Sequence, residues 1–302
     1  MLSPWTTARC LLPLLMLVVA VPLAAQQRLK VFISVDMEGV AGVVSDQQLG
    51  PTGFEYARFR EFMTAEALAA IEGARAAGAT EIVVADSHGN MQNLLVERFP
   101  ADVRIVRGPG RPLSMMQGLD STFHAVVYIG YHSGTTNLDG VRAHTMSSAR
   151  MTGLRLNGTE VSESGFNTAI AGHFGVPVVA ISGDNAAVAE LLALVPGAAG
   201  AVVKEAVGFH AGITRTPEAA QQLIREAVRT GVQRRASIPV PRLAGPYTLE
   251  VGFKNYRAAE WLAYLPIVER TTAHSIRYRS SSLVDVARFL AFIGSYEPEI
   301  AP

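Results

Sequence analysis

The chain has 302 residues, of which 49% are hydrophobic and 17% are charged, and its formal net charge is zero. The hydrophobic fraction is too high for a disordered chain, and there is no basic excess to neutralise nucleic-acid phosphates, so we expect no nucleic-acid partner. A single cysteine excludes an internal disulfide framework and a cysteine-based zinc site.

The first 25 residues have the pattern of a secretory signal peptide. Arg9 precedes an apolar run over residues 11–21, and small residues follow up to Ala25. The alternative is a membrane anchor that is never cleaved, but the run is short for a membrane span. Cleavage would leave 302 − 25 = 277 residues and would remove the only cysteine, Cys10. We therefore expect an exported protein, periplasmic or secreted, without a stable membrane anchor.

The next part of the chain alternates short apolar segments with helical patterns. In chain order we expect strand 29–36, helix 56–77, strand 81–86, strand 124–131, helix 163–174 and strand 176–182. Short apolar strands separated by helices predict a mostly parallel sheet that is covered by helices on both faces. The predicted fold class is therefore α/β.

The pattern changes beyond Pro196. A capped helix begins at Thr216-Pro217, and a strand with alternating apolar residues surrounds Val251. Shorter elements follow up to residue 293, so we expect a smaller C-terminal α+β segment. The predicted organisation is a signal peptide at 1–25, an α/β metal-binding catalytic domain at 26–200, and a C-terminal α+β domain or elaboration at 201–302.

Carboxylates and histidines follow three successive predicted strands. Asp36 and Glu38 come after the first strand and point to the same face if the chain stays extended. His88 follows the second strand and His132 the third, while Glu163 opens the next helix. Each residue alone could be an ordinary loop carboxylate or turn histidine. Because the carboxyl ends of parallel strands converge on one crevice, their joint placement favours a single site.

Neutral imidazoles together with carboxylates form the ligand set of zinc and its neighbours, whereas calcium prefers oxygen ligands only. Five such ligands are more than one tetrahedral zinc needs. With Asp36 as a bridge they could hold two metals roughly 3.5–4 Å apart, as in two-metal hydrolases. This chemistry predicts hydrolysis of a carbonyl or phosphoryl centre.

Several other catalytic motifs are absent from the sequence. There is no Walker phosphate loop, no dinucleotide-binding glycine motif after a strand, no Gly-x-Ser-x-Gly elbow and no His-Glu-x-x-His pair. Asp184, after the fourth strand, is expected to be a turn residue or helix cap. The segment Gly108-Pro109-Gly110 is expected to be a turn.

The run Ser34-Val35-Asp36-Met37-Glu38-Gly39 resembles the opening signature of the D-aminopeptidase family. Other segments match in the family's order and close to its spacing, over roughly residues 30–295. These segments are Asp86-Ser87-His88, Gly130-Tyr131-His132, His144-Thr145-Met146, Glu163-x-Gly165-x-Asn167, Asn255-Tyr256 and Ala259-Glu260-Trp261.

The resemblance implies an activity, a metal and an assembly. Members of the family bind two zinc ions and remove the N-terminal residue from peptides that contain D-amino acids. The resemblance also implies a ring-shaped decamer, and so a homo-oligomer here. It matches His144 to the family's proposed catalytic histidine, either as a nucleophile or as a proton donor and acceptor. The metal ligands that it implies are Asp36, Glu38, His88, His132 and Glu163.

We therefore expect an exported dinuclear zinc aminopeptidase that acts on short peptides. One alternative is another metal-dependent hydrolase, such as an amidase or phosphoesterase, that uses the same ligands. A second alternative is an exported peptide-binding protein that keeps the fold but has no turnover.

Overall fold

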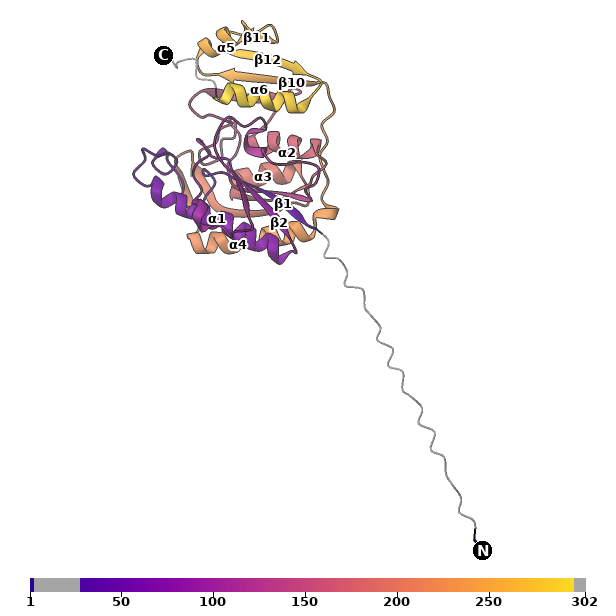
Figure 1. The fold of residues 1–302 in the computed structure, drawn as a ribbon. Coiled ribbons are helices and arrows are strands. Elements are labelled where there is room, and N and C mark those ends of the chain that lie inside the picture. The colour runs from indigo at the N-terminus through magenta and orange to yellow at the C-terminus, as the bar shows by residue number, and fades with distance from the viewer. Residues whose placement is uncertain (3–27, 296–302) are drawn as a thin grey trace.

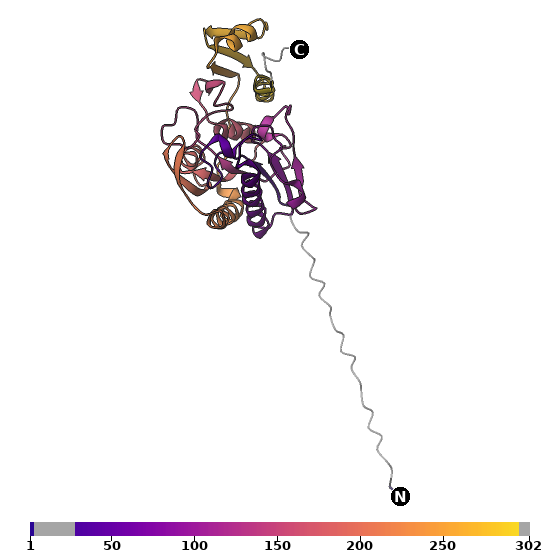
Figure 2. The ribbon, with the colours of Figure 1, turned by 90° about the vertical axis from the view of Figure 1, so that its left-hand side faces the viewer.

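The computed structural model describes residues 1–2 and 28–295 of the chain. The predicted signal peptide, apart from its first two residues, lies outside this described part. Two sheets organise the described residues, one of seven strands and one of five. The larger sheet forms the main body, and the smaller one lies at one end of it (Figures 1 and 2).

The seven-stranded sheet is parallel except at one edge. Every neighbouring pair runs parallel apart from β8 and β9. The chain moves outward from β1 to β3 and then returns to the other side of β1 with β4, so the strand order reverses between β1 and β4. In spatial order the strands are β3 (Arg104–Val106), β2 (Glu81–Asp86), β1 (Lys30–Val35), β4 (Ala125–Tyr131), β7 (Val178–Asp184), β8 (Ala199–Gly208) and β9 (Ala211–Thr214).

Helices cover both faces of this sheet, which confirms the predicted α/β fold class. On one face lie α1 (Tyr56–Ala76) and α4 (Pro217–Gln233), and on the other lie α2 (Glu163–His173) and α3 (Asn185–Leu194) (Figure 1). The backbones of α1 and α4 approach closely, because a Cβ at Gly73 would lie only 2.4 Å from the carbonyl oxygen of Arg225.

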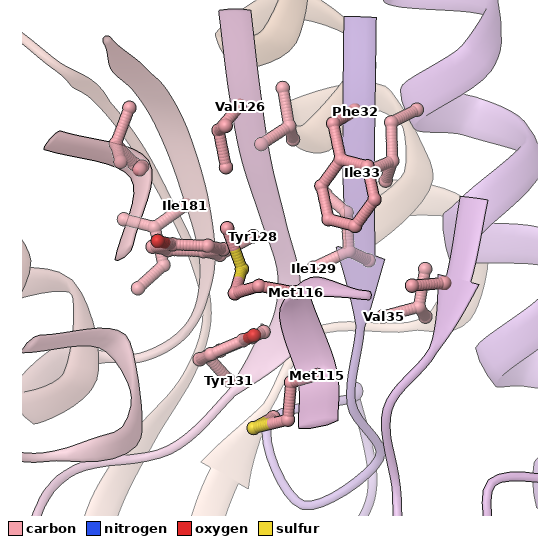
Figure 3. Close-up of a cluster of buried hydrophobic side chains, with 14 of the residues drawn as sticks. Phe32, Ile33, Val35, Met115, Met116, Val126, Tyr128, Ile129, Tyr131 and Ile181 are labelled. Atoms are coloured by element: carbon pink, nitrogen blue, oxygen red, sulfur yellow. The ribbon is translucent and has the colours of Figure 1, made fainter. Parts of the chain in front are cut away.

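The centre of the sheet is an apolar core. Side chains of β1, β4 and β7 meet the short 3-10 helix Ser114–Met116, as Figure 3 shows. The rings of Tyr128 and Tyr131 stack with centroids 4.6 Å apart. Each large apolar side chain buried here contributes roughly 1.5–3 kcal/mol. This core holds β1 and β4 rigidly, so their carboxyl ends are fixed in space.

The second sheet is antiparallel and combines distant parts of the chain. Helix α6 (Leu283–Ser295) lies between this sheet and the main body, and α5 (Tyr256–Leu262) packs near β11 (Figure 1). In spatial order the strands are β11 (Val268–Thr272), β12 (Ser275–Ser280), β10 (Tyr247–Phe253), β5 (Met151–Leu156) and β6 (Thr159–Glu160).

The predicted boundary near residue 200 does not coincide with a division between the two sheets. Strands β8 and β9 and helix α4 lie at or beyond that residue, yet they extend or cover the first sheet. Strands β5 and β6 lie before it, yet they belong to the second sheet, where β5 pairs with β10 and β6 pairs with β5. Because the hydrogen bonds of a sheet join strands irrespective of their distance along the chain, composition along the sequence did not reveal this interleaving.

Candidate functional site

The loop after β1 is pressed against the end of β4. The amide of Asp36 donates to the carbonyl of Ile129 at 2.8 Å, and the amide of Gly39 donates to the carbonyl of Gly130 at 2.7 Å. A Cβ at Gly39 would lie 2.0 Å from the carbonyl oxygen of Tyr131, so only glycine fits there. This close approach fixes Asp36 and the neighbouring Glu38 beside the carboxyl end of β4.

Neighbouring elements bring the other predicted ligands to the same rim. His88 follows β2, His132 directly follows β4, and Glu163 is the first residue of α2. The helix begins there because the side chain of Ser162 accepts a hydrogen bond from the amide of Gly165 at 3.3 Å. All five predicted ligands are buried.

Asp36 lies between two histidines. Its Oδ1 is 3.3 Å from Nδ1 of His88, and its Oδ2 is 3.3 Å from Nε2 of His132. His88 Nδ1 also lies 2.9 Å from Oε2 of Glu38, and His132 Nε2 lies 3.4 Å from Oε1 of Glu163. The two oxygens of one carboxylate therefore face two separate sets of ligand atoms.

Three overlapping groups of side chains each have the geometry to hold a metal ion. Asp36 belongs to two of these groups. Within the described residues, Asp36 Oδ2 and His132 Nε2 are buried and have no hydrogen-bond partner, although they face each other. When the ring of His132 is neutral, these two facing atoms both carry lone pairs, which is costly unless a cation lies between them. The groups are Asp36, Glu38 and His88; Asp36, His132 and Glu163; and Glu38, His132 and His144.

Backbone carbonyls orient the three imidazoles. A carbonyl oxygen can only accept a hydrogen bond, so the ring nitrogen facing it carries the proton and the other nitrogen is left with a lone pair. That second nitrogen faces the carboxylates in every case, which is the arrangement found around metal-binding histidines. The pairs are His88 Nε2 with Leu49 (2.7 Å), His132 Nδ1 with Ser133 (3.0 Å) and His144 Nδ1 with Arg142 (2.7 Å).

The electrostatics of the metal-free cluster are strongly coupled. Burial raises the pKa of Asp36, and the charge of Glu38 raises it further. Burial also opposes ionisation of Glu38, but His88 outweighs it and holds the pKa of Glu38 well below its ordinary value. The pKa values of His88 and His132 are raised well above the ordinary histidine value, because neighbouring carboxylates outweigh the effect of burial. Protons on the histidines thus occupy the place that a cation would take.

His144 adjoins the ligands but is less enclosed. Its ring stacks on that of His132, with centroids 4.0 Å apart and planes inclined by 7°. Its Nε2 lies 3.7 Å from Oε1 of Glu163 and 3.9 Å from Oε1 of Glu38. The ring nitrogen of His144 that does not face a carbonyl is therefore held next to the cluster.

A cavity of about 770 Å³ opens onto the cluster. The five predicted ligands and His144 all line it, and so do Leu290 and Gly294 of α6. This volume lies within the range of small-molecule sites, roughly 300–1,000 Å³. The cavity is thus shared between the carboxyl ends of the parallel strands and the helix of the C-terminal segment.

The family model for D-aminopeptidase matches residues 29–292 of this chain. The chain belongs to the D-aminopeptidase family. This family member is 32% identical over 261 residues to the D-aminopeptidase of Bacillus subtilis (strain 168), a match that covers 85% of this chain and 93% of the relative. It also matches the solved structure of the Zn-dependent D-aminopeptidase DppA from Bacillus subtilis, described as a self-compartmentalizing protease. That match has a TM-score of 0.84 and 30% identity, and covers 88% of this chain and 96% of the other.

This D-aminopeptidase family member is a metal-dependent peptidase, as its sequence predicted. The structure brings all six predicted site residues together, and it places Asp184 as the cap of α3, where its side chain accepts from the amide of Ala187.

Sequence reasoning missed a buried lysine that supports the loop of Asp36 and Glu38. Lys204 of β8, fully buried, donates through Nζ to the carbonyls of Glu38, Val40 (3.1 Å) and Val43 (2.7 Å).

The carboxylate of Glu163 has a further partner that no side-chain pattern could reveal. The backbone amide of Met146 donates to Glu163 Oε1 at 2.7 Å. Met146 has a φ of 65°, and its segment follows His144 directly. The matching run His144-Thr145-Met146 in the sequence was the only signal that pointed to this segment.

Proposed function

We propose that this protein is an exported dinuclear zinc aminopeptidase that removes the N-terminal residue from short peptides containing D-amino acids. The observation that carries the dinuclear assignment is the position of Asp36. Its two carboxylate oxygens face two different histidines at 3.3 Å, and it belongs to two of the groups that could hold a metal. A carboxylate placed in this way is suited to bridge two ions.

The donor set fits zinc. Each proposed ion would have imidazole nitrogen and carboxylate oxygen ligands, which zinc accepts, and the histidines have their second nitrogens bonded to carbonyls. The proposed ligands are Asp36, Glu38, His88, His132 and Glu163. Two zinc ions bound there would act as Lewis acids on the scissile carbonyl and lower the pKa of an attacking water.

The protein's own groups would handle the protons of the reaction. His144 Nε2, unprotonated when the ring is neutral, faces the carboxylates at 3.7 and 3.9 Å and lines the cavity. In the proposed role it accepts a proton as water attacks and returns it to the departing amine. Direct nucleophilic attack by His144 is the second role compatible with its position.

The D-amino-acid preference rests on the relatives. Both the curated relative and the solved structure are named as D-aminopeptidases, and each match covers more than four-fifths of this chain. The amine of the substrate would lie at the metal ligands, and its remaining part would occupy the cavity that reaches α6. A cavity of about 770 Å³ suits a peptide of a few residues.

We further propose that the protein is exported and forms a homo-oligomer, a decamer by analogy with the family. The support for export is the signal-peptide pattern of residues 1–25. Within residues 28–295, no helix has the length and apolarity required to cross a bilayer. The support for assembly is the solved relative, which is described as self-compartmentalizing. N-terminal mass spectrometry of the exported protein and light scattering on the purified protein test these two proposals.

The experiment that tests the activity is a substrate panel on purified protein, before and after chelation and after zinc is restored. We expect hydrolysis of D-alanyl peptides over L-alanyl peptides, two zinc ions per chain by elemental analysis, and loss of activity with the metal. Turnover of phosphate esters or of non-peptide amides alone would favour another metal hydrolase. Peptide binding without turnover would favour a binding protein. Absence of bound metal would contradict both metal-dependent hypotheses, the aminopeptidase and the other hydrolase.

A further inference from the structure

Arg111 is a buried cation in the wall of the candidate active-site cavity, and the charge of Asp86 stabilises it only from a distance. The residue is only 7% exposed and lines the same cavity as His88 and Glu163. Among the described residues, no carboxylate oxygen lies within the 4.0 Å that defines an ion pair with it. A buried charge is costly unless it is paired, so the position calls for an explanation.

Arg111 reaches the cavity through the turn that follows β3. Gly108 and Gly110 have φ values of 91° and 76°, which favour glycine, and they reverse the chain between β3 and Arg111. Since β3 runs parallel to β2, its carboxyl end lies at the same rim as the metal ligands. The turn expected from the sequence thus places Arg111 at the rim where the carboxyl ends of β1, β2 and β4 also lie.

The hydrogen bonds of the guanidinium are incomplete. Nη2 donates to the carbonyl of Asp86 at 2.8 Å and to the sulfur of Met91 at 2.6 Å, and Nη1 donates to the carbonyl of Val106 at 3.4 Å. Nε has no partner in the described part of the chain. A thioether is a weak acceptor, so a stronger one could replace it. Burial lowers the pKa of Arg111 to about 10, but the side chain remains a cation at neutral pH.

We propose that Arg111 binds the free C-terminal carboxylate of a short peptide whose amino end lies at the metal ligands. This inference rests on the proposed aminopeptidase function and specifies its substrate class as di- and tripeptides with an unblocked carboxylate. A guanidinium matches a carboxylate through two parallel hydrogen bonds, which gives both strength and orientation.

The residue that holds Arg111 is close in the chain to a proposed metal ligand. The carbonyl that holds Arg111 belongs to Asp86, only two residues before His88. Because two extended residues span at most about 7 Å, the backbone positions of Asp86 and His88 are no further apart than the two ends of an extended dipeptide. A substrate with its amine near His88 could therefore direct its carboxylate toward Arg111 without leaving the cavity.

A pair of substrates tests this role in the wild-type protein. D-Ala-D-Ala and D-Ala-D-Ala amide differ only in the charge of the C-terminal group. We expect kcat/KM to be about 30-fold higher for the free acid, with most of the difference in KM. In Arg111→Gln the ratio between the two substrates should fall to about one, and in Arg111→Lys it should be intermediate, because lysine keeps the charge without the fork.

Arg150 provides the matched control. It is exposed, lines the same cavity and donates to the carbonyl of Gly294 at 2.7 Å. Arg150→Gln should retain the preference for the free acid. If Arg111→Gln does not fold, Arg111→Lys, which keeps the charge, should still show a lowered ratio. A wild-type ratio near one, an unchanged ratio in Arg111→Gln, or loss of the preference in Arg150→Gln would overturn the proposal. Absence of hydrolysis of both substrates by zinc-loaded wild-type protein would instead contradict the aminopeptidase function itself.

Discussion

At the rim of the first sheet three carboxylates lie buried among histidines, whereas on the second sheet Arg277 pairs with Glu250 and Glu269 near the surface. The surface group is complete, because each charge has an opposite partner and access to water. Within residues 28–295, the buried group has two atoms without hydrogen-bond partners, Asp36 Oδ2 and His132 Nε2. The same kinds of side chain thus form a self-sufficient network in one region and a site that needs a cation in the other.

Removal of a buried ligand should produce the largest effect. We expect His132→Ala to lower kcat/KM by on the order of 10³-fold or more, since the Lewis acidity of a bound metal is worth several kcal/mol. His124, at the opposite end of β4, is the matched control, because its Nδ1 only accepts from the amide of Lys30 at 3.1 Å. Equal losses of activity in His132→Ala and His124→Ala would show that the two ends of the strand do not differ in function.

Chelation should destabilise the protein in a pH-dependent way. The pKa values of Asp36, His88 and His132 are raised in the metal-free fold, and that of Glu66 is raised to about 7, so the folded chain holds protons that the unfolded chain has already released. The stability contributed by these groups is therefore present at low pH and is lost as the pH rises through the raised values.

Between pH 6.5 and 8 we expect the Tm of the chelated protein to fall with rising pH. Lys204, whose pKa is lowered to about 8, acts in the opposite sense near pH 8, but the two histidines outweigh it. The zinc-loaded protein should be stabilised by about 5–10 °C over the chelated one at pH 8, for a metal concentration about 100 times the Kd. Differential scanning calorimetry at matched ionic strength measures both. A chelated protein whose Tm rises over this range would contradict the assigned directions of the pKa shifts.

Lys204 tests whether the loop after β1 needs its buried ammonium. Lys204→Met removes the donor to the carbonyls of Glu38, Val40 and Val43 while it keeps an unbranched apolar side chain. We expect zinc affinity to fall roughly 10–100-fold, the scale found for groups that orient metal ligands. Zinc competition with a fluorescent chelator measures the affinity. Lys30→Met, at the amino end of β1, is the control that should leave it unchanged.

The smallest effect is expected at the surface pairs. Arg277→Met removes a side chain that contacts Glu250 at 2.7 Å and Glu269 at 3.2 Å. Because exposed ion pairs contribute little, we expect the Tm to change by at most about 2 °C and zinc content to stay the same. A loss of zinc in this variant would remove the distinction drawn between the two regions.

Local patterns predicted those elements whose apolar residues repeat clearly. The helix expected at 56–77 is α1, and the strand expected around Val251 is β10. The helix expected to begin at Thr216-Pro217 is α4, which extends to Gln233 and packs against both α1 and the sheet. Strand β5 was not expected, since its partner β10 lies about 90 residues further along the chain, and β6, which pairs with β5, was not expected either.

The sequence by itself determined the order of chemical groups along the chain: carboxylates and histidines after successive strands, in the pattern of the D-aminopeptidase family. Side-chain periodicity and the convergence of parallel strand ends are local or general rules, so they can be read without coordinates. Only the tertiary structure decided which oxygen of Asp36 faces which histidine, and which cations lie behind or beside the site. Lys204 and Arg111 donate to backbone carbonyls of residues far away in sequence. Every residue has such a carbonyl, so the sequence does not show which of them a distant side chain will contact.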